Sequence, residues 1–360
     1  MLQHSGFQQK KILVVDKAPK TANDRTWCFW EQTPGLFQPI VHHQWEQMHF
    51  YSNTYSSLLD LAPYKYKMIR GIDFYTYVMD AAKQHNNITF RYGNVEAFAN
   101  EGNGAAVVLD GERINADYVF NSIMLAAPSV PHNKYYLLQH FKGWYIQTES
   151  PVFDAQRATL MDFRVSQQHG TTFVYVLPLA ANKALVEYTL FTQKTLAPEA
   201  YDTALADYIK EYYTTESYSI TEQEFGIIPM TNIRFSPGLG RIVNIGTVGG
   251  QTKASSGYTF RFIQKQSAAI VQALLHNNNP RVDDSLTDKR FNLYDSTLLN
   301  VLHHNKMGGD QVFARMFSKN DPDRVLRFLD NESTLEDELN IMASVPSGIF
   351  MKAAFQEMFR

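Results

Sequence analysis

The sequence predicts a mixed α/β (α+β) fold, with an antiparallel sheet inserted into a parallel-sheet unit and a helical carboxyl-terminal region. The apolar run Ile12–Asp16 ends in an acid, which is typical of a strand buried on both faces of a parallel sheet. Strand-like runs between residues 155 and 191 have short connections, which favours antiparallel pairing. Apolar residues beyond 285 recur at helical spacing to the last residues.

The amino-terminal residues fit part of a dinucleotide-binding unit. Such a unit runs strand, glycine turn, helix and second strand, and an acid at the end of the second strand binds the ribose hydroxyls. Residues 1–6 match the last turn of the helix, with Gly6 in the left-handed cap position. Asp16 is then a candidate ribose ligand. The alternative is that Asp16 only starts a turn, which is the ordinary reading of an isolated run ending in Asp.

A helix and a group of short strands follow. Apolar spacing predicts a helix from Asp73, which can cap its start, to about residue 86. Residues 88–121 alternate between strand-like runs and the turn signals 102–104 and 110–111, which predicts a β-meander.

The next elements form the inserted sheet and its return to the first unit. The strand-like runs are Thr159 to Val165, Thr171 to Leu179 and Lys183 to Phe191. Residues 242–245 form another apolar strand, followed by glycines and by a long amphipathic helix that begins around Ser256 and stops at residues 277–280.

The segment from Gly246 to Tyr258 is the best local signal for a ligand site. Glycines let a ligand approach the backbone, and free amides at a helix start attract anions and electron-rich oxygens. Gly246, Gly249 and Gly250 lie within five residues at this strand-to-helix junction. A nucleotide or flavin fits such a loop. An ordinary loop before a capped helix is the alternative.

Glu187 is the candidate acid. It stands among apolar neighbours, with Leu185 and Thr189 on the same strand face, and burial would raise its pKa until it can act as a general acid near neutral pH. A solvated glutamate on a strand face is the alternative. Asp162 is a candidate second acid, although a salt bridge to Arg164 or Arg157 explains it equally well.

Composition excludes several classes of function. The net charge of -3, with no long run of one sign, argues against nucleic acid as a partner. The single cysteine, Cys28, allows no internal disulfide or thiolate zinc site and fits a reducing cytoplasm. The adjacent pairs 42–43 and 303–304 place histidines in different directions, so no metal site is expected. No Gly-x-Ser-x-Gly elbow is present, so hydrolase chemistry is unsupported. Every apolar run is shorter than the ~18 residues that span a bilayer, so no transmembrane helix is expected.

Five segments, taken in order, resemble the bacterial type of the flavin-dependent lycopene cyclase family. They are Asn23-Asp24-Arg25-Thr26-Trp27, Gln139-His140-Phe141-Lys142-Gly143, Met161-Asp162, Phe173 to Leu179 with Leu185 to Thr189, and Gly246 to Tyr258. The resemblance covers nearly the whole chain. The first segment is one residue longer than the family's Asn-x-Thr-Trp, and Tyr188 stands where the family has a second acid after Glu187.

This resemblance implies a glutathione-reductase-like FAD-binding fold. Its parts would be residues 1–128 and 229–280 for FAD, 129–228 for the substrate, and 281–360 as a helical region. The family's glycine turn is expected upstream of Met1, which would then be an internal methionine and the first βα unit would be missing. The resemblance makes Glu187 the essential acid and implies cofactor contacts by Asp16, Gly246, Gly249, Gly250, Ser256, Gly257 and Tyr258.

The activity implied is that of a lycopene β-cyclase. An acid protonates the end of an acyclic carotenoid such as lycopene, the cation closes a ring, and a proton is lost, with FAD reduced by NAD(P)H but no net redox change. Such an enzyme is expected in the cytoplasm, in peripheral contact with the inner face of the cell membrane. The rival interpretations are an FAD-dependent monooxygenase or isoprenoid reductase, and an inactive or carotenoid-binding fragment.

Overall fold

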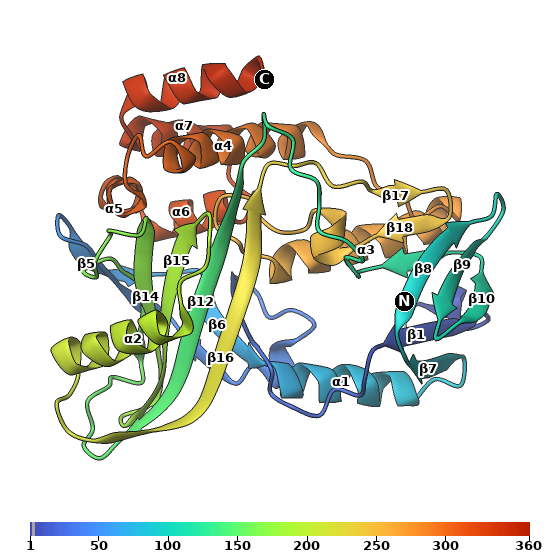
Figure 1. Cartoon of the computed structure of the whole chain (residues 1–360), viewed down its shortest axis with the longest axis horizontal. Coiled ribbons are helices and arrows are strands. Elements are labelled where there is room, and N and C mark those ends of the chain that lie inside the picture. Colours follow the sequence, from blue (N-terminus) through green and yellow to red (C-terminus); the bar gives the residue numbers. More distant parts are fainter. Residues whose placement is uncertain (2–3) are drawn as a thin grey trace.

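The structure is a computed structural model that describes residue 1 and residues 4–360. A large twisted sheet, several small sheets and a layer of helices make up the molecule (Figure 1). The predicted mixed α/β class is confirmed.

The large sheet has seven strands in the order β16-β12-β15-β14-β13-β4-β5. Their bounds are β16 Tyr218–Thr231, β12 Tyr136–Thr148, β15 Lys183–Thr192, β14 Thr171–Ala180, β13 Arg157–Asp162, β4 Gln47–Tyr51 and β5 Ser56–Asp60. The predicted antiparallel pairing of β13, β14 and β15 is confirmed. Strand β4, which joins β13 in parallel, is not among the strands that the sequence pattern predicts.

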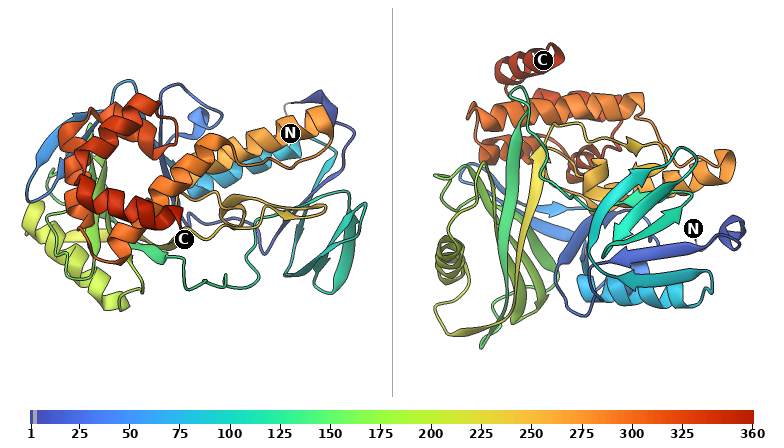
Figure 2. Two further views of the ribbon diagram at one scale, coloured as in Figure 1. Left: turned by 90° about the horizontal axis from the view of Figure 1, so that it is seen from above. Right: turned by 45° about the vertical axis from the view of Figure 1, so that its right-hand side comes forward.

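The two faces of this sheet have different partners. Helix α2, Pro198–Tyr212, packs on one face over a cluster that includes Val186, Tyr188 and Tyr208. The opposite face carries Tyr175, Leu185 and other members of the main core cluster. Figure 2 shows α2 on the outer side of the sheet and the carboxyl-terminal helices gathered at its end.

The remaining strands form the smaller sheets. Strand β1, Ile12–Asp16, pairs in parallel with β7, Ile88–Tyr92, and β11, Val119–Asn121, pairs in parallel with β18, Ile242–Asn244. Strands β8, Val95–Asn100, β9, Ala105–Leu109, and β10, Glu112–Ala116, form the predicted meander. The remaining strands are β2 Thr26–Glu31, β6 Lys65–Arg70, β3 His43–Trp45 and β17 Gly238–Leu239.

Two amino-terminal predictions are wrong. Strand β1 is not buried on both faces, because it belongs to a two-stranded sheet and Leu13 and Val14 remain exposed by 36% and 38%. Gly6 does not adopt the left-handed cap conformation, since it lies inside the short 3-10 helix Ser5–Phe7. The rest of the predicted helical turn includes residues 2–3, which lie outside the described residues.

Two predicted helices begin at other residues. Helix α1, Gly71–Lys83, starts before Asp73, which therefore lies in the first turn and binds Arg70 at 2.7 Å instead of capping the helix. Helix α3, Phe260–Asn277, starts after Ser256 because Gly257 has a φ of +74°, outside the range that a right-handed helix allows. Its predicted end is confirmed by Asn278 in the left-handed cap position.

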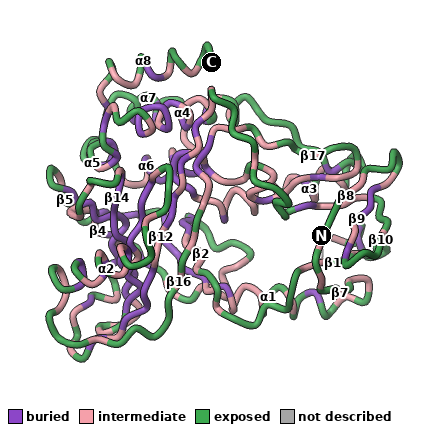
Figure 3. The backbone as a smooth tube through the Cα atoms, viewed as in Figure 1, coloured by how far each residue is buried: buried purple, intermediate pink, exposed green. Residues whose placement is uncertain are grey.

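The carboxyl-terminal region is helical, as predicted. Its helices are α4 Leu286–His303, α5 Gly309–Lys319, α6 Pro322–Leu329, α7 Leu335–Ser344 and α8 Ser347–Met358. Capping boxes start two of them, at Ser285 with Asp288 and at Thr334 with Asp337. Two further 3-10 helices are Gln38–Ile40 and Gly246–Gly249. Buried residues concentrate in the large sheet, whereas the small sheets are mostly intermediate or exposed (Figure 3).

Candidate active site

Glu187 lies in a row of residues that crosses four strands of the large sheet. Gly143 on β12 pairs with Glu187 on β15 and with Glu224 on β16, and Tyr175 on β14 pairs with Glu187 from the other side. Residues directly opposite one another in antiparallel strands point to the same face. The row therefore places two carboxyl groups on one face, with a glycine between them.

Gly143 leaves the space that the two carboxyl groups need. A Cβ atom at this position would lie 2.9 Å from Leu185 Cδ1, closer than real Cβ contacts, and 3.0 Å from Glu224 Cγ, a tight contact. A side chain here would press on Leu185 and Glu224. Close approach therefore favours the glycine, whose φ lies outside the left-handed range.

The environment favours a protonated Glu187. Burial raises the pKa of Glu187 well above its ordinary value, and the charge of Glu224 and a hydrogen bond between the two carboxyl groups raise it further. The hydroxyl of Thr189 donates to Glu187 Oε1 at 3.0 Å, which acts in the opposite direction. As whole residues, Glu187 and Glu224 are of intermediate exposure.

Glu224 is held as the acceptor of the pair. Burial raises its pKa, whereas hydrogen bonds from Thr26 and Glu187 lower it. Thr26 Oγ1 donates to Glu224 Oε2 at 2.8 Å and lies 2.6 Å from the hydroxyl of Tyr145. Because Thr26 donates its only proton to the carboxyl, Tyr145 donates to Thr26. The hydrogen bond from Thr26 thus favours the ionised form of Glu224.

Aromatic side chains connect the row to the segment 246–258. The hydroxyls of Tyr175 and Tyr258 lie 3.3 Å apart, and the Tyr258 ring meets Trp30 edge-on with centroids separated by 4.5 Å. Cys28 and Tyr66 also face this region, and burial raises the pKa of both groups well above their ordinary values. The structure therefore brings Glu187 and Tyr258, two residues predicted separately, into one site.

The glycine-rich segment is a turn, held by buried contacts. Gly246–Gly249 form a 3-10 helix that ends at Gly250, whose φ is +77°. A Cβ at Gly249 would lie 2.5 Å from the carbonyl oxygen of Asn244, so this glycine packs against its own backbone. Lys253 Nζ donates to buried Asp295 at 2.8 Å, which ties the segment to α4.

Two buried polar atoms near Gly257 have no hydrogen-bond partner among the described residues. They are Ser256 Oγ and Gln139 Oε1. A Cβ at Gly257 would lie 2.0 Å from Gln139 Oε1, so the strand residue and the turn are in direct contact. Buried polar groups without partners are rare and costly, and each is free to bind a polar group of a ligand.

Asp162 lies on the other face of the sheet. Its carboxylate accepts from Arg164 Nε at 2.9 Å and from the hydroxyl of Tyr208 on α2 at 2.7 Å. Asp162 thus forms the salt bridge with Arg164 that is the alternative to a catalytic role. It does not lie beside Glu187. Tyr188, which replaces the family's second acid, is buried on this face too. The Tyr188 side chain therefore lies on the opposite face of the sheet from Glu187.

Asp16 ends β1 at the surface. It forms a salt bridge with Lys20 at 3.2 Å and accepts from the amide of Lys17 at 2.7 Å. A hydrogen bond to Asp24 raises the pKa of Arg25, and the charge of Asp16 adds to this rise. Asp16 thus stands at the end of a parallel strand, where nucleotide ligands of such sheets bind.

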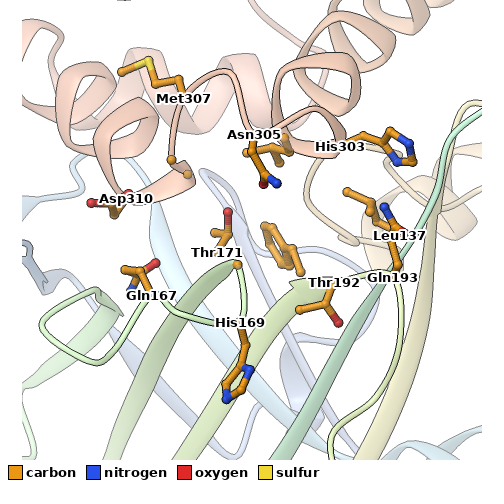
Figure 4. Close-up of a pocket in the computed structure, with 15 residues that line it drawn as sticks. Leu137, Gln167, His169, Thr171, Thr192, Gln193, His303, Asn305, Met307 and Asp310 are labelled. Carbon is orange, nitrogen blue, oxygen red and sulfur yellow. The ribbon is translucent and has the colours of Figure 1, made fainter.

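A pocket of about 360 Å³ lies at the end of β14 and β15 against the loop between α4 and α5. Figure 4 shows Thr171, Thr192 and His169 on one side of it and Asn305 and Met307 on the other. Phe191, on the same strand face as Glu187, also lines it. Glu187 is not a lining residue, so this pocket is separate from the carboxyl pair.

Comparison with known proteins identifies the family of this chain. The family model described as "Lycopene cyclase protein" matches residues 3–355. Lycopene beta-cyclases of Pseudescherichia vulneris and Pantoea ananas are 26% and 25% identical over 62% and 61% of this chain. The matched part spans 56% of each of these relatives, little more than half of their length.

Solved structures share the fold at low sequence identity. A geranylgeranyl bacteriochlorophyll reductase-like protein from Thermoplasma acidophilum has a TM-score of 0.61 at 11% identity, with 96% of this chain and 93% of that one covered. A flavin-dependent brominase has a TM-score of 0.57 at 10% identity, covering 97% and 93%. A probable FAD-dependent monooxygenase from Pseudomonas aeruginosa has 0.54 at 11%, covering 84% and 92%.

The family model covers nearly the entire chain, and the curated relatives carry the same family name. The chain belongs to the lycopene cyclase family.

Proposed function

We propose that this protein is a lycopene β-cyclase, which closes the acyclic end groups of lycopene to β-rings by acid catalysis. The observation that carries the proposal is the carboxyl pair of Glu187 and Glu224, beside an aromatic wall and with a raised pKa at Glu187. The names of the curated relatives support the same reaction.

Glu187 is the proton donor in this reaction. A carboxyl that stays protonated near neutral pH can protonate the terminal double bond, and a nearby double bond of the same end group attacks the resulting cation. Loss of a proton from the ring cation leaves the β-ring, so no electrons are consumed. The rings of Tyr175, Tyr258 and Trp30, which contact one another, would favour a cation near their negative faces.

FAD is the cofactor proposed for this site. The turn at 246–258 offers Ser256 Oγ and, beside it, Gln139 Oε1 as free polar atoms, which fits the polar edge of a bound ring system. Asp16 would hold the ribose hydroxyls. When bound and reduced by NAD(P)H, FAD would supply an electron-rich ring near the cation.

Removing the Asp16 carboxylate is expected to weaken FAD binding by roughly 10- to 100-fold, since hydrogen bonds to a charged group contribute about 1.5–3 kcal/mol. Flavin fluorescence titration of Asp16→Ala against wild type measures this ratio. Asp80→Ala is the matched control, because Asp80 is an exposed acid that pairs with Lys83 as Asp16 pairs with Lys20. Equal affinities of wild type and Asp16→Ala would contradict the assignment.

The proposed substrate is an acyclic carotenoid, taken from the cytoplasmic face of the cell membrane by peripheral contact. Helices α7 and α8 support this with exposed apolar side chains at helical spacing, namely Leu335, Leu339, Met351, Phe355 and Met358. No helix within the described residues is long and apolar enough to cross a bilayer.

Product analysis tests the proposed function. The purified protein is supplied with lycopene, FAD and a reductant. The carotenoids are separated by chromatography, and their molecular masses are measured by mass spectrometry. A cyclase yields β-rings at unchanged mass. A monooxygenase would add oxygen, a reductase would add hydrogen, and a protein that only binds carotenoid would return lycopene; each of these outcomes contradicts the proposal.

A further inference from the structure

We propose that Glu224 is a positioning residue that shares one proton with Glu187 across Gly143 and so keeps Glu187 in its proton-donating form. This inference rests on the proposed function and adds a second acid to it. The sequence next to Glu187 does not indicate a second acid, because the adjacent residue is Tyr188, which packs against α2 on the other face of the sheet.

Geometry brings the two carboxyl groups together. Glu187 and Glu224 lie on strands separated only by β12, and both pair with Gly143. Neighbouring strands are about 4.8 Å apart, so the two Cα atoms are about 10 Å apart, a span that two glutamate side chains bridge when no side chain stands between them. The Glu224 side chain lies over Gly143, where a Cβ would be 3.3 Å from Glu224 Oε1.

Hydrogen bonds hold both members of the pair. Glu224 Oε2 accepts from Thr26 at 2.8 Å and Glu187 Oε1 accepts from Thr189 at 3.0 Å, and a further hydrogen bond joins the two carboxyl groups. When two carboxyl groups lie this close, one stays protonated and donates to the other, so that the pair shares one proton. The titratable or charged groups that act on the pair from the surrounding elements are Cys28, Tyr66, Tyr145, Tyr175, Glu222 and Tyr258.

The proton count balances over one turnover. Glu187 transfers its proton to a carbon of the substrate double bond, which leaves both carboxyl groups ionised beside the new cation. The two negative charges stabilise that cation in an apolar site. When the ring cation loses its proton to the pair, the double bond of the β-ring forms and the pair again holds one proton. No oxidant or reductant is consumed.

Infrared pH titration of the purified full chain tests the shared proton without any turnover. The C=O stretch of a protonated carboxyl, assigned to Glu187 by its loss in Glu187→Gln, is expected to persist at neutral pH in wild type. In Glu224→Gln its midpoint should fall by about one pH unit or more, because the like charge that raises the pKa is gone. Glu199→Gln, which removes an exposed acid on α2, should leave the midpoint unchanged.

A second variant keeps the test valid if Glu224→Gln fails to fold. Glu224→Asp retains the charge but shortens the reach across Gly143, so a smaller fall of the same midpoint is expected. An unchanged midpoint in the folded Glu224 variants would overturn the inference. Lycopene turnover by wild type is measured separately. A shifted midpoint without β-ring products would support the carboxyl pair and contradict the proposed cyclase. β-ring products without a shifted midpoint would support the cyclase and contradict the carboxyl pair.

Discussion

Replacing Glu187 by Gln is expected to reduce β-ring formation by roughly 10²- to 10⁴-fold, the usual worth of general acid catalysis. Gln has the size and polarity of Glu and can still accept from Thr189, but it has no proton of comparable acidity. The measurement is chromatography of carotenoids from lycopene-producing cells that express wild type or Glu187→Gln.

Folding and flavin binding should survive this change. Thermal unfolding and FAD fluorescence of Glu187→Gln therefore serve as the internal controls. Tyr188→Phe, at the next position but on the face covered by α2, is the positional control and should cyclise lycopene as wild type does. Cyclisation by Glu187→Gln at the wild-type rate would show that Glu187 is structural.

The second large effect is expected from Gly143→Val, which should reduce cyclisation at least about 100-fold. Its side chain would occupy the space between Leu185 Cδ1 and Glu224 Cγ and push the carboxyl groups apart, and a displacement of about 1 Å in a catalytic group can cost that much in rate. Gly143→Ala adds one methyl group and should be intermediate. Product yields of the three proteins at equal expression give the comparison.

Stability separates displacement from misfolding in this series. Gly348→Ala is the control for adding a methyl group, since a Cβ at Gly348 on α8 meets nothing within 4 Å. If Gly143→Val and wild type unfold at similar temperatures but differ in yield, the displaced carboxyl groups account for the loss. Equal yields from Gly143→Val and wild type would show that the space beside Gly143 is not needed for cyclisation.

Much of the fold follows from local patterns. Alternation around Glu187 places Leu185 and Thr189 on its face, and the register confirms this. The turn signal at Asp110 and Gly111 gives two positive φ angles, 47° and 78°, as a tight hairpin requires. These features depend on neighbours in the chain, which a pattern can show. The exposure of β1 depends on which strands pair with it, and no local pattern contains that information.

Glu224 is missed for a physical reason. In β16 the acids Glu222 and Glu224 alternate with Phe225 and Ile227, a pattern that predicts acids toward solvent and apolar side chains toward the core. In the structure Glu224 is partly buried, whereas Phe225 and Ile227 on this edge strand are 53% and 51% exposed. Only the long-range pairing with β12 turns Glu224 toward Glu187.

The irregular pairing of β12 with β16 also bears on how this strand can change in length during evolution. Tyr145 pairs with Glu222 but Ile146 pairs with Ile220, so Thr221 is an extra residue in a bulge. An insertion or deletion of one residue at the bulge, or between the bulge and Tyr218, does not change the sheet face toward which Glu224 points. Between the bulge and Thr231 a single-residue insertion or deletion would reverse the faces of part of the strand. We therefore expect length variation among homologues to accumulate on the Tyr218 side of Glu222.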